Sequence, residues 1–253
     1  MRRCSKPWPP ANVSPDGQAA RRFIDAEREY LAALPGRADK SAFARATYEQ
    51  LDKPKLRAVM YREQRSVCVY CERSISETQP PPTIEHWRPL SRDHHHALHW
   101  RNLYLSCSTV ETCNSAKGDR HFRWDDADPD LPWPTDVAYE DLVGFSRGGE
   151  IYIRNDANID AATRRAIELA LNDCLDGGHR RNAILNLNHP ALVAARKAAL
   201  DNERTKLQRD FEGRRASKDQ RIGRANRMLQ QDAAPAYVSV RVAWLRGSLG
   251  RGR

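Results

Sequence analysis

The sequence predicts an α+β fold, in which a small unit of two strands and one short helix lies within a mainly helical chain. Two observations support this prediction. Apolar residues recur at helical spacing towards the N-terminus, as Phe23, Ile24, Tyr30 and Leu31 do. The middle of the chain contains four cysteines in two close pairs that frame two short strand-like segments. We divide the chain into three segments: 1–54, 55–124 and 125–253.

The first segment is predicted to be an arm followed by helices. Residues 1–16 contain four prolines, which favours an extended arm. Ser41 is a suitable N-cap, and Pro54 suits the first turn of a helix. Helices are therefore expected over residues 18–34, 41–51 and 54–65. We expect them to support the cysteine-bearing unit or to hold a partner.

The second segment is predicted to have the order strand, strand, helix. A proline-rich loop precedes the first strand, and a polar loop with three consecutive histidines separates the two strands. The expected elements are a strand over 83–87, a returning strand over 102–106 and a short helix over 114–121.

The third segment is predicted to contain a hairpin and several helices. Gly148 and Gly149 mark a turn within residues 142–154. Asn188 is expected to cap a helix that begins at Pro190. The expected helices span residues 160–172, 190–211 and 218–231. Residues 246–253 are expected to be disordered, and the acidic residues 125–130 to form a solvated loop.

The cysteine pairs predict a zinc site. Two residues separate Cys68 from Cys71, and five separate Cys107 from Cys113. Thiolates on such short spacings are typical ligands of structural zinc, and four of them leave no open position on the ion. We therefore expect Zn²⁺ in a structural role, where it replaces the core that so small a unit cannot build. Ordinary buried cysteines are the alternative, which two pairs around a hairpin make less favourable.

Composition and charge limit the class of protein. The 253 residues include 42 Lys and Arg against 33 Asp and Glu, a net charge of +9. A basic surplus in residues 201–253, where Arg221, Arg224 and Arg227 share a helix face, would attract phosphodiester backbones or dock a partner. A solvated helix surface is the alternative. No apolar run suits a membrane span, and no signal peptide is recognisable, so we expect a cytoplasmic protein.

A dipeptide between the cysteine pairs suggests hydrolytic chemistry. Glu85 could hold a metal ion, and His86 could deprotonate water as a general base. A lone histidine is otherwise often a structural hydrogen-bonding group. Because neighbouring side chains on a strand point to opposite faces, we expect a bulge or twist to bring the two together.

The order of these motifs resembles the HNH endonucleases, the ββα-metal superfamily. The matching residues are Cys68-x2-Cys71, Ile84-Glu-His-Trp-Arg-Pro89, Trp100-Arg-Asn-Leu103 and Cys113-Asn-Ser-Ala-Lys-Gly118. The stretches Leu56–Gln64 and Ile184–Asn188 are similar to one branch, the PtuB-type nuclease subunit of Septu and retron-associated anti-phage systems. The resemblance is most specific over residues 55–120.

The resemblance implies a role for each site residue. Glu85 and Asn114 would bind a catalytic divalent cation, Mg²⁺ or another, although many relatives have Asp and His at these positions. Both side chains offer the oxygen ligands that a hard cation accepts. Asn102 would brace the loop that carries the base, and Lys117 would contact a substrate phosphate. Helix capping by Asn114 and a solvated Lys117 are the alternatives.

The implied function is a metal-dependent endonuclease that acts on nucleic acid in anti-phage defence, with a PtuA-type ATPase as its partner. Two alternatives remain open at this stage. One is a zinc-stabilised nucleic-acid-binding or scaffold protein without catalysis. The other is an HNH restriction nuclease outside the Septu and retron systems. Metal-aided attack on phosphorus is common to DNA and RNA, so the motifs do not choose between these substrates.

Overall fold

The computed structural model describes residue 6 and residues 18–76, 81–119, 130–176, 179–181 and 183–250. In this part the chain is α+β and mostly helical, with small antiparallel hairpins and a buried group of four cysteines. No helix in it is both long and apolar enough to cross a membrane. Cys4, most of the N-terminal arm and acidic residues 125–129 lie outside the described residues, as does the side chain of Cys174.

The three N-terminal helices are confirmed with small changes at their ends. They are α1 (Gln18–Ala33), α2 (Lys40–Glu49) and α3 (Lys53–Gln64). Ser41 is not the N-cap of α2. That position belongs to Asp39, whose carboxylate accepts a hydrogen bond from the backbone of Ala42 at 2.9 Å. Asp and Ser cap helices about equally well, so sequence alone could not separate the two.

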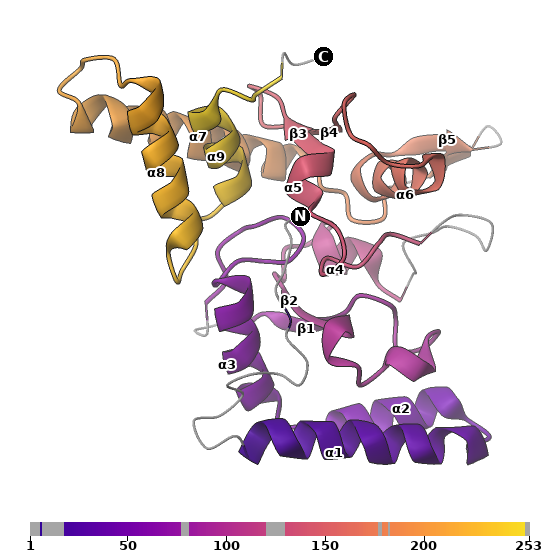
Figure 1. Cartoon of the computed structure of the whole chain (residues 1–253). Helices are drawn as coiled ribbons and strands as arrows, with labels where there is room; N and C mark the ends of the chain where they lie inside the picture. The colour runs from indigo at the N-terminus through magenta and orange to yellow at the C-terminus, as the bar shows by residue number, and fades with distance from the viewer. Residues whose placement is uncertain are drawn as a thin grey trace.

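The expected order of two strands and a helix is present in the middle of the chain (Figure 1). The elements are β1 (Thr83–His86), β2 (Leu103–Ser106) and α4 (Cys113–Lys117). β1 and β2 pair in antiparallel register. α4 ends at Lys117, earlier than predicted, and the last two residues of the expected helix, 120 and 121, lie outside the described residues.

A glutamine side chain attaches α3 to this hairpin. The Gln64 amide donates to the carbonyl of Leu105 at 2.8 Å, and its oxygen accepts the Leu105 backbone N–H at 2.6 Å. Gln64 therefore bonds to β2 as a neighbouring strand would. The contact fixes α3, and the cysteine turn that follows it, against the hairpin.

The C-terminal segment contains the predicted hairpin and helices together with elements that the sequence did not indicate. The predicted ones are β3 (Val143–Phe145), β4 (Ile151–Ile153), α6 (Ala161–Leu171), α7 (Pro190–Asp210) and α8 (Lys218–Gln230). The additional ones are α5 (Tyr139–Leu142), β5 (Cys174–Asp176), β6 (His179–Arg181) and α9 (Val238–Arg246). Gly250 is bonded to the hairpin, since its N–H donates to the carbonyl of Phe145 at 3.0 Å, so the expectation of disorder is wrong for residues 246–250. Residues 251–253 lie outside the described part of the chain.

Asn188 does not cap α7, because its side chain is used elsewhere. The N-cap is His189, whose imidazole accepts from Ala191. The Asn188 amide instead bonds to the backbone N–H and carbonyl of Ile151, both at 2.8 Å. This pair of bonds connects the start of α7 to β4.

The three predicted segments share one hydrophobic core. A single buried cluster includes Phe23, Leu103 and Leu192, one from each segment. Trp87 and Trp100 are fully buried within it, consistent with a packing role for both. The segment that contains the four cysteines therefore shares its core with helices from both ends of the chain.

Candidate active site and metal centre

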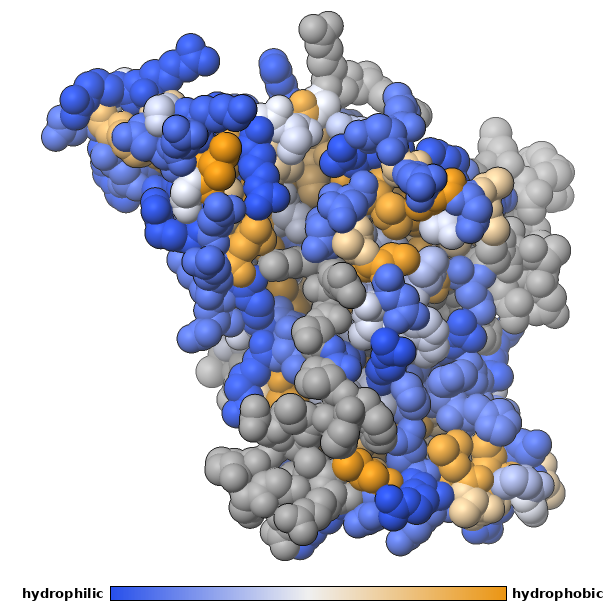
Figure 2. Space-filling model, in the orientation of Figure 1, coloured by the Kyte–Doolittle hydropathy of each residue, from blue (hydrophilic) through white to orange (hydrophobic). Residues whose placement is uncertain are grey.

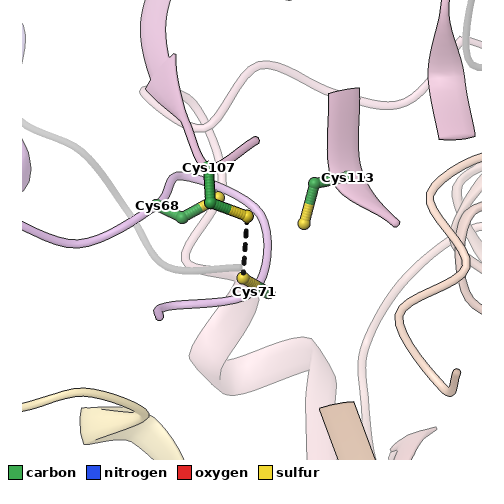
Figure 3. A group of neighbouring side chains, drawn as sticks. All are labelled: Cys68, Cys71, Cys107 and Cys113. Carbon is green, nitrogen blue, oxygen red and sulfur yellow. Dashed lines mark hydrogen bonds between the residues drawn. The ribbon is translucent and has the colours of Figure 1, made fainter. Parts of the chain in front are cut away.

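Four cysteines from three parts of the chain meet in the interior (Figure 3). Cys68 and Cys71 lie in the turn that follows α3, Cys107 follows β2, and Cys113 begins α4. All four are buried and none forms a disulfide. The N–H of Cys113 donates to the carbonyl of Leu185 at 2.9 Å, which connects the cluster to the C-terminal segment.

The spacing of the sulfur atoms suits a tetrahedral zinc ion. All four Sγ atoms lie within 4.8 Å of one another, and those of Cys71 and Cys107 are 3.8 Å apart. A tetrahedron with Zn–S bonds of about 2.3 Å has sulfur–sulfur edges of about 3.8 Å. The cluster could therefore hold a structural zinc, as the sequence predicted.

The four thiols also shift one another's pKa values. Hydrogen bonds from the neighbouring thiols, Cys113 first, hold the pKa of Cys107 well below its usual range. The same contacts raise the pKa of Cys71 and that of Cys113. Four thiolates this close together would repel one another, and a bound Zn²⁺ would offset their charge.

His86 lies at the end of β1 with one ring nitrogen engaged. Its Nε2 is 3.0 Å from the carbonyl oxygen of Ala97, and the ring of Tyr48 packs edge-on against it at 4.7 Å between centroids. A carbonyl oxygen can only accept, so Nε2 carries the hydrogen and Nδ1 keeps its lone pair. Burial lowers the pKa of His86 to about 4, so the imidazole is neutral at pH 7.

Asn102 holds the loop between the two strands. Its amide donates to the carbonyls of Arg88 and His96 at 3.0 and 2.8 Å, and its oxygen accepts the N–H of Arg88 at 2.7 Å. The side chain is completely buried. These three bonds fix both ends of the loop that contains Ala97, the partner of His86.

Glu85 is buried and paired with a lysine. Its Oε1 accepts a hydrogen bond from Tyr70 at 3.0 Å and forms an ion pair with Lys117. The Lys117 ammonium also donates to the carbonyl of His86 at 2.6 Å. Burial raises the pKa of Glu85, and the nearby ammonium opposes that shift. Because Lys117 is only 1% exposed, it is not solvated as a surface lysine would be, and its charge faces Glu85.

The expected bulge in β1 is absent. Glu85 and His86 pair in regular register with Tyr104 and Leu103. Their side chains consequently have different neighbours, Lys117 for the glutamate and Ala97 for the histidine. The dipeptide is thus divided between two faces of the strand, as regular strand geometry requires.

Asn114 lies in the first turn of α4 and is half-buried. It does not cap the helix, since Thr112 occupies the N-cap position, so the capping alternative for Asn114 is wrong. Of the two residues expected to hold a divalent cation, Glu85 already pairs with an ammonium. Among the described residues, the groups of three or more His, Cys, Asp or Glu side chains that could hold a metal ion do not include Glu85.

Sequence reasoning missed the residues that orient the site. Glu85 is oriented by Tyr70, which lies between Cys68 and Cys71. His86 is oriented by Tyr48 and Ala97, which lie outside the sequence motifs. The consecutive histidines form a short 3-10 helix, His94–His96, capped by Asp93, whereas a loop was expected there. Asp93 binds His96 Nδ1 at 2.8 and 2.9 Å.

Comparisons with known proteins leave the family undecided. Neither the models of known protein families nor the curated proteins include a match to this chain.

Proposed function

We propose that this protein is an HNH-type endonuclease that hydrolyses phosphodiester bonds of nucleic acid, with His86 as its general base. The observation that carries the proposal is the hydrogen bond from His86 Nε2 to the carbonyl of Ala97. It leaves the Nδ1 lone pair available, and the low pKa keeps the ring neutral at physiological pH. Such a nitrogen can accept a proton from water, and the hydroxide formed would attack phosphorus.

Asn102 has the role of a positioning residue in this proposal. It bonds to the backbone at both ends of the loop that supplies the Ala97 carbonyl. Fixing that carbonyl fixes the tautomer and the orientation of His86. The side chain of Asn102 needs no contact with substrate.

The divalent cation is a separate part of the proposal. The resemblance assigns it to Glu85 and Asn114, and when bound it would stabilise negative charge that develops on the phosphate. In the arrangement described, the Lys117 ammonium neutralises Glu85. We therefore assign no step to the cation, and we expect Mg²⁺ to bind only in competition with Lys117.

The proposal extends to biological role by resemblance alone. A nuclease of the PtuB type would act in anti-phage defence with a PtuA-type ATPase, docked through helices outside residues 55–120. Co-purification with an ATPase encoded beside it tests this part. A stable nuclease that never binds such an ATPase would instead favour an HNH restriction nuclease outside these systems.

Replacing His86 tests the proposed chemistry. His86→Ala should retain zinc and bind nucleic acid but lose cleavage by roughly 10²–10⁴-fold, the usual contribution of a general base. His95→Ala is the matched control, because His95 is an exposed residue of the neighbouring loop. Cleavage of DNA and RNA is measured with Mg²⁺ or Mn²⁺ present. Cleavage by His86→Ala at the wild-type rate would overturn the proposal.

A second function is favoured by the Glu85–Lys117 pair. A glutamate that is buried and neutralised is poorly placed to bind a metal ion, as expected of a zinc-stabilised nucleic-acid-binding protein without catalysis. The two functions differ in one measurement. Wild-type protein that binds nucleic acid but cuts neither DNA nor RNA with any divalent cation would establish the second.

A further inference from the structure

Three arginines from different elements surround a tryptophan on the C-terminal helices. α8 and α9 pack together beside α7 (Figure 1). At the end of α9 they enclose a cleft of about 220 Å³. The residues that line it are Arg147, Arg204, Arg221, Trp244, Gly247 and Leu249. No acidic residue is among these lining residues, so the cleft carries three positive charges.

Arg221 supplies a buried donor that has no acceptor. Its Nη2 donates to the carbonyl of Trp244 at 2.7 Å and so caps the end of α9. Its Nε is buried and has no hydrogen-bond partner within the described part of the chain. A buried N–H without an acceptor is unfavourable. Because this Nε has almost no contact with solvent, an anion in the cleft would reach it only if the guanidinium shifted, and what Arg221 contributes to the cleft is its positive charge.

The indole of Trp244 positions two of the guanidinium groups. Those of Arg204 and Arg221 lie 5.8 and 5.6 Å from its ring centroid, within cation–π range. Arg204 also pairs with Asp201 at 3.2 Å, and both side chains are nearly half exposed. Exposed pairs of this kind are weak, so a phosphate can compete with Asp201 for Arg204.

Arg147 reaches the cleft from the turn between β3 and β4, and that turn is fixed in place. Ser146 Oγ accepts the N–H groups of Gly148 and Glu150, both at 3.1 Å. The buried side chain of Arg196, on α7, donates to the carbonyl of Gly149 at 2.5 Å. The backbone of Arg147 is therefore held against α7, which carries Arg204.

We propose that this arginine cleft binds a phosphate group of the nucleic-acid backbone. Guanidinium groups match phosphate oxygens in geometry as well as charge. The surrounding chain is basic too, since residues 201–253 contain 13 Lys and Arg against 6 Asp and Glu, a net charge of +7. Hydrophilic side chains cover much of the face drawn in Figure 2. Contacts with phosphate alone do not depend on base sequence.

The inference deepens the proposed function, because it gives the same substrate a second contact. The cleft is built from the β3–β4 turn and α7 to α9, whereas His86 lies on β1. Nucleic acid bound at both places would be held during cleavage by contacts that take no part in the reaction.

Salt dependence of binding tests the cleft. Both proteins are the full chain with His86→Ala, so that the nucleic-acid probe stays intact. One has no further change, and the other, the cleft variant, also has Arg147→Gln and Arg204→Gln. Binding to labelled duplex DNA and to single-stranded RNA of mixed sequence is followed by fluorescence anisotropy. Losing one phosphate contact should flatten the slope of log affinity against log salt by about 0.9 on the duplex and about 0.7 on the single strand. Arg221 is left intact because it caps α9.

A second pair of substitutions controls for charge alone. Arg209→Gln with Arg214→Gln removes the same charge from side chains that are 76% and 79% exposed and lie outside the cleft. A smaller change in the control than in the cleft variant supports the proposal. Equal changes in the two overturn it. So does an unchanged slope in the cleft variant, including the case in which that variant instead loses binding to an ATPase partner.

The same variants separate the cleft from the nuclease. Weaker binding in the cleft variant supports the cleft even if wild-type protein cleaves nothing. If the cleft variant binds nucleic acid as tightly as the protein with an intact cleft, the proposed phosphate site is overturned, even if His86→Ala abolishes cleavage.

Discussion

Glu85 and His86 are neighbours in sequence, but their side chains lie in different surroundings. The glutamate faces an ammonium and a phenol, whereas the histidine faces a backbone carbonyl and an aromatic ring. The motif alone could identify this pair as the candidate site. It could not identify the partner of Glu85, because Lys117 is 32 residues away and is just as plausible on the surface of a short helix.

The half-buried imidazole of His86 should make the free energy of unfolding sensitive to acid. Its folded pKa is about 4, whereas histidine in an unfolded chain titrates near 6.5. As pH falls through this window, the unfolded chain gains a proton that the folded chain does not. The free energy of unfolding is therefore unaffected by His86 above about pH 6.5, and it falls by roughly 3 kcal/mol by about pH 4. Urea unfolding of wild type and of His86→Gln at pH 7 and at pH 4 measures how much of the loss is due to His86.

His86→Gln is a suitable reference for that experiment because glutamine can still donate to the Ala97 carbonyl but does not titrate. Other carboxyl and imidazole groups contribute equally in both proteins and cancel in the comparison. If the two proteins lose the same free energy of unfolding between pH 7 and pH 4, the histidine is not held in its neutral form.

At the scale of elements, local sequence patterns predicted those helices and strands whose conformation does not depend on packing against distant parts of the chain. The hairpin at Gly148 and Gly149 was predictable from turn residues flanked by apolar ones. α9 was not, because Val238, Val240 and Val242 alternate with other residues as in a strand. Burial against α7 and α8 stabilises a helix there instead, a tertiary effect that a local pattern cannot contain.

The arginines of α8 illustrate the same limit. Their spacing suggested one face for phosphate or partner, but Arg224 pairs with Glu203 and Asp210 of α7, and Arg221 caps α9. Arg227 remains exposed. Charge reversal of all three would therefore disturb helix packing, so exposed Arg147 and Arg204 are better probes of phosphate binding.

The turn between β3 and β4 should require glycine at position 149. Gly149 has a φ of +97°, and an added Cβ would lie 2.5 Å from the carbonyl oxygen of Val193 on α7. Gly149→Ala should lose roughly 1–3 kcal/mol through backbone strain, with more from this contact. Thermal or urea unfolding measures the loss.

Two other glycines separate the causes. Gly213 has a φ of +79° with open space around it, so Gly213→Ala tests strain alone. Gly148 has neither a positive φ nor a contact closer than 3.4 Å. The expected order of destabilisation is Gly149, then Gly213, then Gly148. A loss at Gly149 no larger than that at Gly213 would mean that α7 moves to accept the methyl group.

At the scale of the whole molecule, residues from all three segments pack into one hydrophobic core. The cysteine spacing could predict a zinc site, because thiolates in two close pairs are typical ligands of structural zinc. It could not predict that helices from both ends of the chain would share a core with that site. Cys113 and Leu185 share a hydrogen bond but lie far apart in the sequence, so a local motif cannot reveal this contact.

Zinc should therefore stabilise more than the hairpin unit. The four cysteines join the turn after α3, the end of β2 and the start of α4, and α4 is bonded to the C-terminal segment. Structural zinc contributes about 10–16 kcal/mol in small zinc-dependent peptides, comparable with the roughly 5–15 kcal/mol that holds a whole domain together. Cys107→Ser should lose bound zinc and unfold at a markedly lower temperature, with α7 to α9 affected as well. Elemental analysis, expected to give one zinc per wild-type chain, and hydrogen exchange along the chain measure these effects.

Cys4→Ser is the control, since no zinc role is predicted for Cys4. A Cys107→Ser protein that keeps its zinc, or one that melts like wild type, would remove the structural role assigned to the cluster.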